Sequence, residues 1–155
     1  TQGAGHERNL RPGTENVLEI AGLGKAAEIV MQDLDINFQH FKEMRDSLQL
    51  GVISFVGEDS ARVNGHPNFK LPNTLSISFR NQQANNLLSR ISTLVAASAG
   101  AACHADQINI SNVLMAMNIP VEWAMGTLRF SVGRETSREE IDFAIQVICQ
   151  AIIKN

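Results

Sequence analysis

The stretch LRFSVGRETSREEIDFAIQVICQAI, residues 128–152, reads as a strand followed directly by a helix. Its first five residues alternate between apolar and polar side chains, which predicts a half-buried strand. Ser137 and Glu140 then have the spacing of a capping box, in which each side chain bonds the other residue's backbone N–H. The helix that follows carries one continuous apolar stripe, made of Ile141, Ala144, Ile145, Ile148, Cys149 and Ile152.

Strand and helix patterns also alternate upstream of this stretch. Helical patterns occupy residues 17–30, 35–50, 83–91, 112–117 and a segment from Pro120. Asn16 or Thr14 is placed to cap the first of these helices. Short apolar or alternating runs predict strands at 52–56, 61–64, 74–79 and 94–96. The sequence therefore predicts an α/β fold, with a small sheet covered by helices on one face.

Composition limits the classes of function. The chain has 155 residues, 44% of them apolar and 19% charged, which is typical of a soluble globular protein. The net charge of −3, without a basic patch, argues against nucleic acid as a partner. No apolar run reaches the ~20 residues that span a bilayer. Two cysteines, one of them on the apolar stripe, indicate a reducing compartment, and we expect a cytoplasmic protein without a metal site.

The segment ASAGAACHAD, residues 97–106, is the first candidate functional site. Its small residues have little to pack, so we expect a loop that carries Cys103. A cysteine on a loop is placed to meet a ligand. The alternative is that Cys103 is a small buried hydrophobe, which is the commoner role of a free cysteine.

The segment GAGHERNLRPGTEN, residues 3–16, is the second candidate. It contains glycines, arginines and a threonine but almost no hydrophobic residue, so it cannot form a core of its own. Arginine and threonine side chains suit a phosphate or a carboxylate, and glycine lets the backbone approach such a ligand. The alternative is a solvated, charged tail.

Four blocks resemble the cysteine desulfurases and selenocysteine lyases, which are class V, fold-type I enzymes that depend on pyridoxal phosphate. The blocks are residues 5–16 (GHERNLRPGTEN), 71–74 (LPNT), 100–104 (GAACH) and 128–134 (LRFSVGR). The first and third have the form found in selenocysteine lyases. The resemblance implies that residues 1–34 are the end of the large cofactor-binding domain with a connecting helix, and residues 35–155 the C-terminal small domain.

The resemblance also implies roles for single residues. Cys103 matches the catalytic cysteine, and His104 is placed to tune its proton. Arg129 matches the arginine that binds the α-carboxylate of the substrate. Gly13 and Thr14 match residues that reach across a homodimer to the phosphate of the partner subunit's cofactor.

The lysine that binds pyridoxal phosphate covalently in this family has no match in the chain. The lysines present are Lys25, Lys42, Lys70 and Lys154, and none has the expected serine-histidine-lysine setting. We therefore expect the C-terminal part of an enzyme, inactive by itself.

The resemblance leaves three functional hypotheses. The first is a selenocysteine lyase that releases selenide and L-alanine from L-selenocysteine. The second is a cysteine desulfurase that passes sulfur from a Cys103 persulfide to an acceptor protein. The third is a fragment that is not catalytic and acts only through association.

Overall fold

The computed structural model describes residues 3, 5–104 and 107–153, with the side chains of 101–109 left out of the description. The chain divides into two compact units, Thr1–Ile36 and Asn37–Asn155. The elements, in chain order, are η1 (Glu7–Asn9), α1 (Val17–Val56), β1 (Ala61–Val63), β2 (Thr74–Phe79), α2 (Ala84–Ile91), β3 (Ser98–Ala99), β4 (Ala101–His104), β5 (Gln107–Ile110), α3 (Asn112–Ala116), α4 (Val121–Ala124), β6 (Thr127–Ser131) and α5 (Arg138–Ile153).

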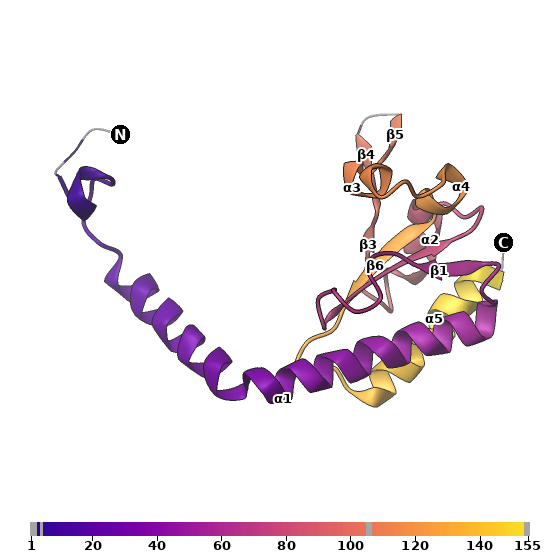
Figure 1. Ribbon diagram of the computed structural model, residues 1–155, viewed down its shortest axis with the longest axis horizontal. Helices are drawn as coiled ribbons and strands as arrows, with labels where there is room; N and C mark the ends of the chain where they lie inside the picture. The colour runs from indigo at the N-terminus through magenta and orange to yellow at the C-terminus, as the bar shows by residue number, and fades with distance from the viewer. Residues whose placement is uncertain (1–2, 4, 105–106, 154–155) are drawn as a thin grey trace. The chain divides into compact units, whose positions relative to one another are not determined.

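The second unit is built on an antiparallel sheet with the strand order β1-β2-β6-β3 (Figure 1). Strands β4 and β5 pair with each other as a separate two-stranded ribbon. In the central pair of the sheet, Leu75 lies opposite Phe130 and Ile77 opposite Leu128. Because successive side chains of a strand point to opposite faces, this register places all four apolar residues on one face.

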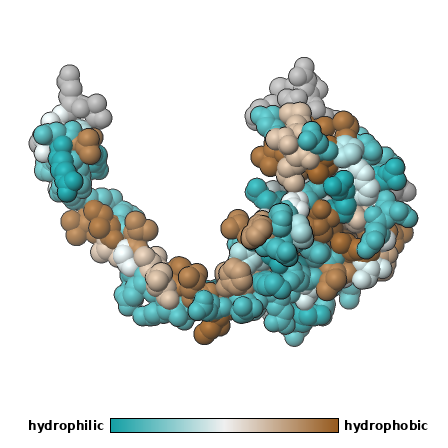
Figure 2. Space-filling view, viewed as in Figure 1, coloured by the Kyte–Doolittle hydropathy of each residue, from teal (hydrophilic) through white to brown (hydrophobic). Residues whose placement is uncertain are grey.

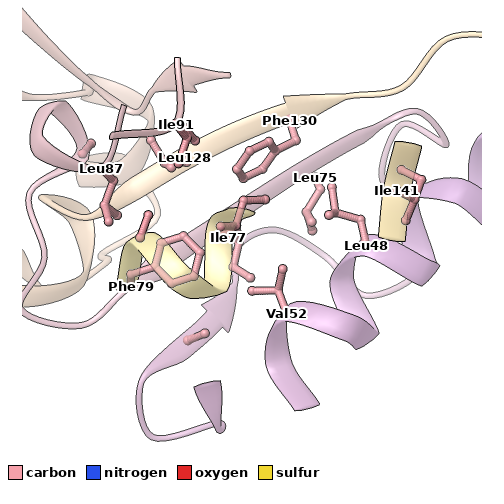
Figure 3. Packing of buried hydrophobic residues seen from close by; sticks show 14 of the residues in the cluster. Leu48, Val52, Leu75, Ile77, Phe79, Leu87, Ile91, Leu128, Phe130 and Ile141 are labelled. Carbon is pink, nitrogen blue, oxygen red and sulfur yellow. The ribbon is translucent and has the colours of Figure 1, made fainter. Parts of the chain in front are cut away.

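That apolar face forms the core of the unit (Figure 3). Helices α1, α2 and α5 cover it, and the buried side chains include Leu48, Val52, Leu75, Ile77, Phe79, Leu87, Ile91, Leu128, Phe130, Ile141 and Ile148. The alternation predicted for the two central strands is confirmed, as is the predicted small sheet with helices on one face. The α/β class assigned from the sequence is therefore correct.

The first helix differs from the prediction. The chain forms the single helix α1 where two helices were predicted, and residues 52–56 belong to it, so the strand predicted there is wrong. Met44, Leu48 and Val52 are buried at four-residue spacing, so the helical stripe runs straight through the short apolar run. Gly51 lies inside the helix, and a Cβ there would overlap the Ile145 side chain of α5. Its small size lets the two helices approach closely.

The predicted N-cap of α1 is confirmed at Asn16, whose Oδ1 accepts a hydrogen bond from the N–H of Glu19 at 3.4 Å. The apolar side chains that define the helical pattern before residue 37 are exposed, as the surface of that segment shows (Figure 2). They include Val17, Leu18, Ile20, Leu23, Val30, Met31, Leu34 and Ile36. Within the described residues of the first unit, no other element covers this apolar face.

The segment around Cys103 is also more ordered than predicted. Ser98–Ala99 forms β3 at the edge of the main sheet, so the strand predicted at 94–96 lies a few residues later. Ala101–His104 forms β4 and pairs with β5, with Cys103 opposite Ile108, so the loop predicted there is a strand. Residues 105 and 106 of the predicted loop lie outside the described residues. Alanine and glycine, which dominate this segment, have a low propensity for strands. The pairing with the alternating sequence of 107–110 fixes the extended backbone.

The final helix follows the prediction closely. The backbone N–H of Ser137 donates to Glu140 Oε2 at 2.9 Å, and the N–H of Glu140 donates to Ser137 Oγ at 3.2 Å. These reciprocal bonds are the predicted capping box. Pro120 precedes α4 as its N-cap, one position earlier than the first-turn position predicted for it. None of the described helices has the length and hydropathy needed to cross a membrane.

Candidate active site

The face of the sheet opposite the core is polar. The register places Ser76 opposite Arg129 and Ser78 opposite Thr127, so these four side chains share that face. Ser78 and Thr127 are buried, whereas Arg129 is exposed. The alternation that places apolar side chains in the core therefore also places a cluster of polar side chains on the opposite face of the sheet.

A hollow of about 470 Å³ lies over this polar face. The sheet side is lined by Ser76, Thr127 and Arg129, and helix α3 contributes the apolar side chains of Val113 and Leu114. The remaining lining residues are Asn64, Gly65, Ala99, Gly100, Ser111 and Met117. A concave site with apolar walls and a few converging polar groups is typical of a small-molecule site.

Arg129 is held in place by its neighbours along β6. Leu128 and Phe130 are buried on the core face, and they fix the strand so that the intervening side chain reaches the hollow. Within the described ranges, no hydrogen bond or ion pair engages the Arg129 guanidinium. Its planar fork is thus available, and such a fork binds a carboxylate at two points.

Asn64 and Ser76 are site residues that the sequence did not single out. Asn64 lies just after β1 and is tied to β2, because its backbone N–H donates to the carbonyl of Ser76 at 2.9 Å. For Ser76 the sequence does contain a signal. Serine alternates with apolar residues in 74–79, so the serines must face away from the core. Asn64 has no such local signal, because only the pairing of β1 with β2 brings it to the hollow.

The backbone of Cys103 lies in β4, which begins next to a lining residue of the hollow. Gly100 precedes β4, and its N–H donates to the carbonyl of Thr127 at 2.7 Å. A Cβ at Gly100 would lie 2.8 Å from the Thr127 side chain, so only glycine fits there. The side chains of Cys103 and His104 lie outside the described residues.

Gly13 and Thr14 belong to the other compact unit. Gly13 has φ of +100°, a conformation that favours glycine. Arg11 Nη1 donates to the carbonyls of Gly13 and Thr14 at 3.1 and 3.0 Å, and the Thr14 side chain is exposed. An exposed hydroxyl beside a guanidinium fits a phosphate group.

The described lysines are engaged elsewhere. Lys25 and Lys42 form ion pairs along α1, and Lys70 Nζ donates to Gln49 at 3.3 Å. Lys154 lies outside the described residues. The described chain thus has residues that fit the phosphate of pyridoxal phosphate and the carboxylate of an amino acid, but no uncommitted lysine to bind the cofactor covalently.

Cys149 is a core residue, as predicted from the apolar stripe. Its side chain is 1% exposed, and burial raises the pKa of its thiol. A buried thiol with a raised pKa is a poor nucleophile, which removes Cys149 from the candidate site. Among the described residues, no group of histidine, cysteine, aspartate or glutamate side chains is arranged to hold a metal ion.

Comparison with known proteins agrees with this fold. The sequence profile of the class V aminotransferases matches residues 1–143. The chain belongs to the class V aminotransferase family. Enzymes of this family depend on pyridoxal phosphate, which is therefore the expected cofactor.

Two groups of relatives are similar to the chain. Human selenocysteine lyase is 41% identical over 155 residues, which cover 97% of this chain and 35% of that protein. The cysteine desulfurase NifS of Azotobacter vinelandii is 38% identical over 148 residues, with 95% and 36% covered. The chain thus spans little more than a third of the length of these relatives.

Solved structures give the same family. A NifS-like protein superposes with a TM-score of 0.85 at 29% identity, covering 100% of this chain and 39% of that one. The NifS-like protein from Rickettsia africae superposes with a TM-score of 0.82 at 25% identity, with 96% and 38% covered. The similarity therefore includes the arrangement of strands and helices as well as the sequence.

Proposed function

We propose that the chain is the C-terminal part of a cytoplasmic selenocysteine lyase, which converts L-selenocysteine to L-alanine and selenide. The observation that carries this proposal is the Arg129 guanidinium, which has no partner among the described residues. It lies on the polar face of the sheet, at the hollow beside which the Cys103 strand begins. The similarity to selenocysteine lyases over nearly the whole chain supports the choice of substrate.

In this proposal the chain contributes two parts of the intact enzyme. Residues 1–34 are the end of the large domain with its connecting helix, and residues 35–155 are the small domain. The exposed apolar side chains of α1 before residue 37 support this division, because they suit burial against further protein. Gly13 and Thr14 contact the cofactor phosphate of the partner subunit in a homodimer.

Arg129 binds the α-carboxylate of the amino acid in the hollow. Two parallel N–H···O bonds fix the carboxylate, and with it the direction of the Cα–H bond that must be broken. Pyridoxal phosphate, when bound, supplies the electron sink for the carbanion that forms at Cα. The apolar side chains from α3 exclude water beside the reacting atoms.

Cys103 distinguishes the two candidate reactions. In the lyase, Cys103 stays a neutral thiol beside the selenolate of the substrate. The Cβ–Se bond breaks with its electron pair on Cβ, which takes up a proton, and a thiol reductant supplies the two electrons that convert the released selenium to selenide. In the desulfurase, the Cys103 thiolate attacks the substrate sulfur. The Cβ–S bond then breaks, its electron pair stays on Cβ, and Cβ takes up a proton to become the methyl group of alanine.

Assays of the full-length protein with both substrates distinguish these two reactions. With matched concentrations of L-selenocysteine and L-cysteine and excess thiol reductant, we expect alanine to form at least about tenfold faster from selenocysteine, a difference of about 1.4 kcal/mol in activation free energy. Mass spectrometry after incubation with L-cysteine alone should show no added sulfur on Cys103. Comparable turnover of cysteine with a Cys103 persulfide would replace the lyase by the desulfurase.

The alternative is that residues 1–155 by themselves are not catalytic and act only through association. The ion pairs and hydrogen bond that engage Lys25, Lys42 and Lys70 favour this alternative. We expect that residues 1–155 mixed with pyridoxal phosphate give only the absorbance of the free cofactor. A lysine-linked absorbance band that borohydride reduction makes permanent would contradict this. Peptide mapping would then name the lysine.

A further inference from the structure

Asn64 lies at the edge of the hollow and has a buried side-chain oxygen. The residue is 6% exposed. Its Nδ2 donates to Ser78 Oγ at 2.7 Å and to Ser76 Oγ at 3.3 Å, whereas its Oδ1 has no hydrogen-bond partner among the residues that the structure describes. Buried polar atoms are almost always paired, so an unpaired oxygen in a site indicates a donor that is brought to it.

The hydrogen-bond chain behind Asn64 fixes which way the amide faces. The carbonyl of Trp123 can only accept, so the Thr127 hydroxyl donates to it, at 3.3 Å. Ser78 must then donate to Thr127, at 2.7 Å, and its own oxygen is left as an acceptor. Only the NH₂ group of Asn64 can satisfy that acceptor. These donor and acceptor roles therefore direct the amide oxygen of Asn64 away from the Ser78 and Thr127 hydroxyls.

Arg129 carries donors at the same hollow as this oxygen. It lies directly opposite Ser76 on the polar face, and residues opposite each other in an antiparallel pair have Cβ atoms about 5 Å apart. Asn64 contacts the same Ser76 through its backbone and its side chain. Asn64 and Arg129 both line the hollow, and the guanidinium has no other partner in the described part of the chain.

We propose that Asn64 is a positioning residue, whose Oδ1 accepts a hydrogen bond from the Arg129 guanidinium and so orients it toward the substrate carboxylate. The inference rests on the proposed role of Arg129. A guanidinium has five N–H donors, and a carboxylate bound by the fork uses two of them. A neutral amide oxygen orients the remaining donors without competing for the positive charge, as an aspartate would.

A double-substitution cycle in the full-length holoenzyme tests this role. We expect Asn64→Ala to raise the Kd for L-alanine, measured by calorimetry, and the KM for selenocysteine about tenfold, with kcat changed less than about twofold, as for loss of one hydrogen bond to a charged group. In an Arg129→Ala background, the same substitution should leave the Kd unchanged. Coupling of this kind shows that Asn64 acts through Arg129.

Ser78→Ala tests the hydrogen-bond chain, because it removes the acceptor that holds Asn64 Nδ2 and leaves only the longer bond to Ser76 Oγ to orient the amide. Its Kd for L-alanine should rise, but by less than that of Asn64→Ala, which removes Oδ1 itself. Asn64→Asp keeps the shape but adds a negative charge beside the guanidinium. It should weaken L-alanine binding more than Asn64→Ala does, because the new carboxylate competes with that of the ligand.

The outcomes separate the two proposals. If Asn64→Ala weakens binding equally with and without Arg129, or if Ser78→Ala weakens binding more than Asn64→Ala does, the positioning role is wrong. If Arg129→Ala by itself leaves the Kd for L-alanine unchanged, the carboxylate role in the proposed function is wrong. Circular dichroism melting of each variant identifies a loss of binding that comes from unfolding.

Discussion

Substitution of Arg129 by alanine in the full-length protein should lower kcat/KM for the amino acid substrate by about 100- to 1,000-fold. Removing one member of a desolvated, hydrogen-bonded charge pair typically costs 2–5 kcal/mol, because the other charge is left without a partner. The exposed guanidinium at the hollow is the group that we assign to the substrate carboxylate. Steady-state kinetics over a wide range of substrate concentration measures the effect.

Two variants make this measurement specific. Arg129→Lys keeps the charge but loses the planar fork, so its kcat/KM should recover only part of the loss. Arg134 lies three residues after the end of β6, exposed and paired with Glu135 at 3.0 Å, and Arg134→Ala should change kcat/KM less than about twofold. Equal losses in the Arg129 and Arg134 variants would show a general effect of positive charge and contradict the carboxylate assignment.

Substitution of Phe79 by alanine should destabilise the second unit by about 3–5 kcal/mol. The Phe79 side chain is fully buried, and it packs in the cluster formed by the sheet and its covering helices (Figure 3). The substitution removes this buried ring and leaves a cavity. Hydrogen exchange of amides in β2 and α5, followed by mass spectrometry in the full-length protein, measures the free energy of opening.

Phe143 provides the control for this substitution. It lies on α5 but is 48% exposed, so Phe143→Ala removes the same atoms with little change in the core. Its effect on the opening free energy should be less than about 1 kcal/mol. If the two variants opened with equal free energies, the cluster around Phe79 would not be the stabilising core of the unit.

The sequence was sufficient for those parts of the fold whose pattern is local and long enough. The stripe of α5, its capping box and the alternation in β6 each extend over several residues, and all three are confirmed. The alternation also places Arg129 and Phe130 on opposite faces. The position of Arg129 on the polar face was therefore predictable before the hollow was known.

The errors have physical causes. Residues 52–56 form a short apolar run that fits a strand or a buried helix equally well, and the burial of Leu48 and Val52 on one face decides for the helix. The backbone around Cys103 is extended because β5 pairs with β4, which no pattern inside residues 97–104 indicates. Asn64 is brought to the hollow by pairing between strands that are distant in the sequence.

The two-sided strand β6 limits how the chain can change in length. One residue inserted between Leu128 and Arg129 would exchange the faces of the later side chains of the strand, placing Phe130 over the hollow and a guanidinium among hydrocarbon. Insertions in the exposed turn 133–136 would leave that parity intact. We therefore expect related sequences to tolerate gaps in the turn but not in the strand.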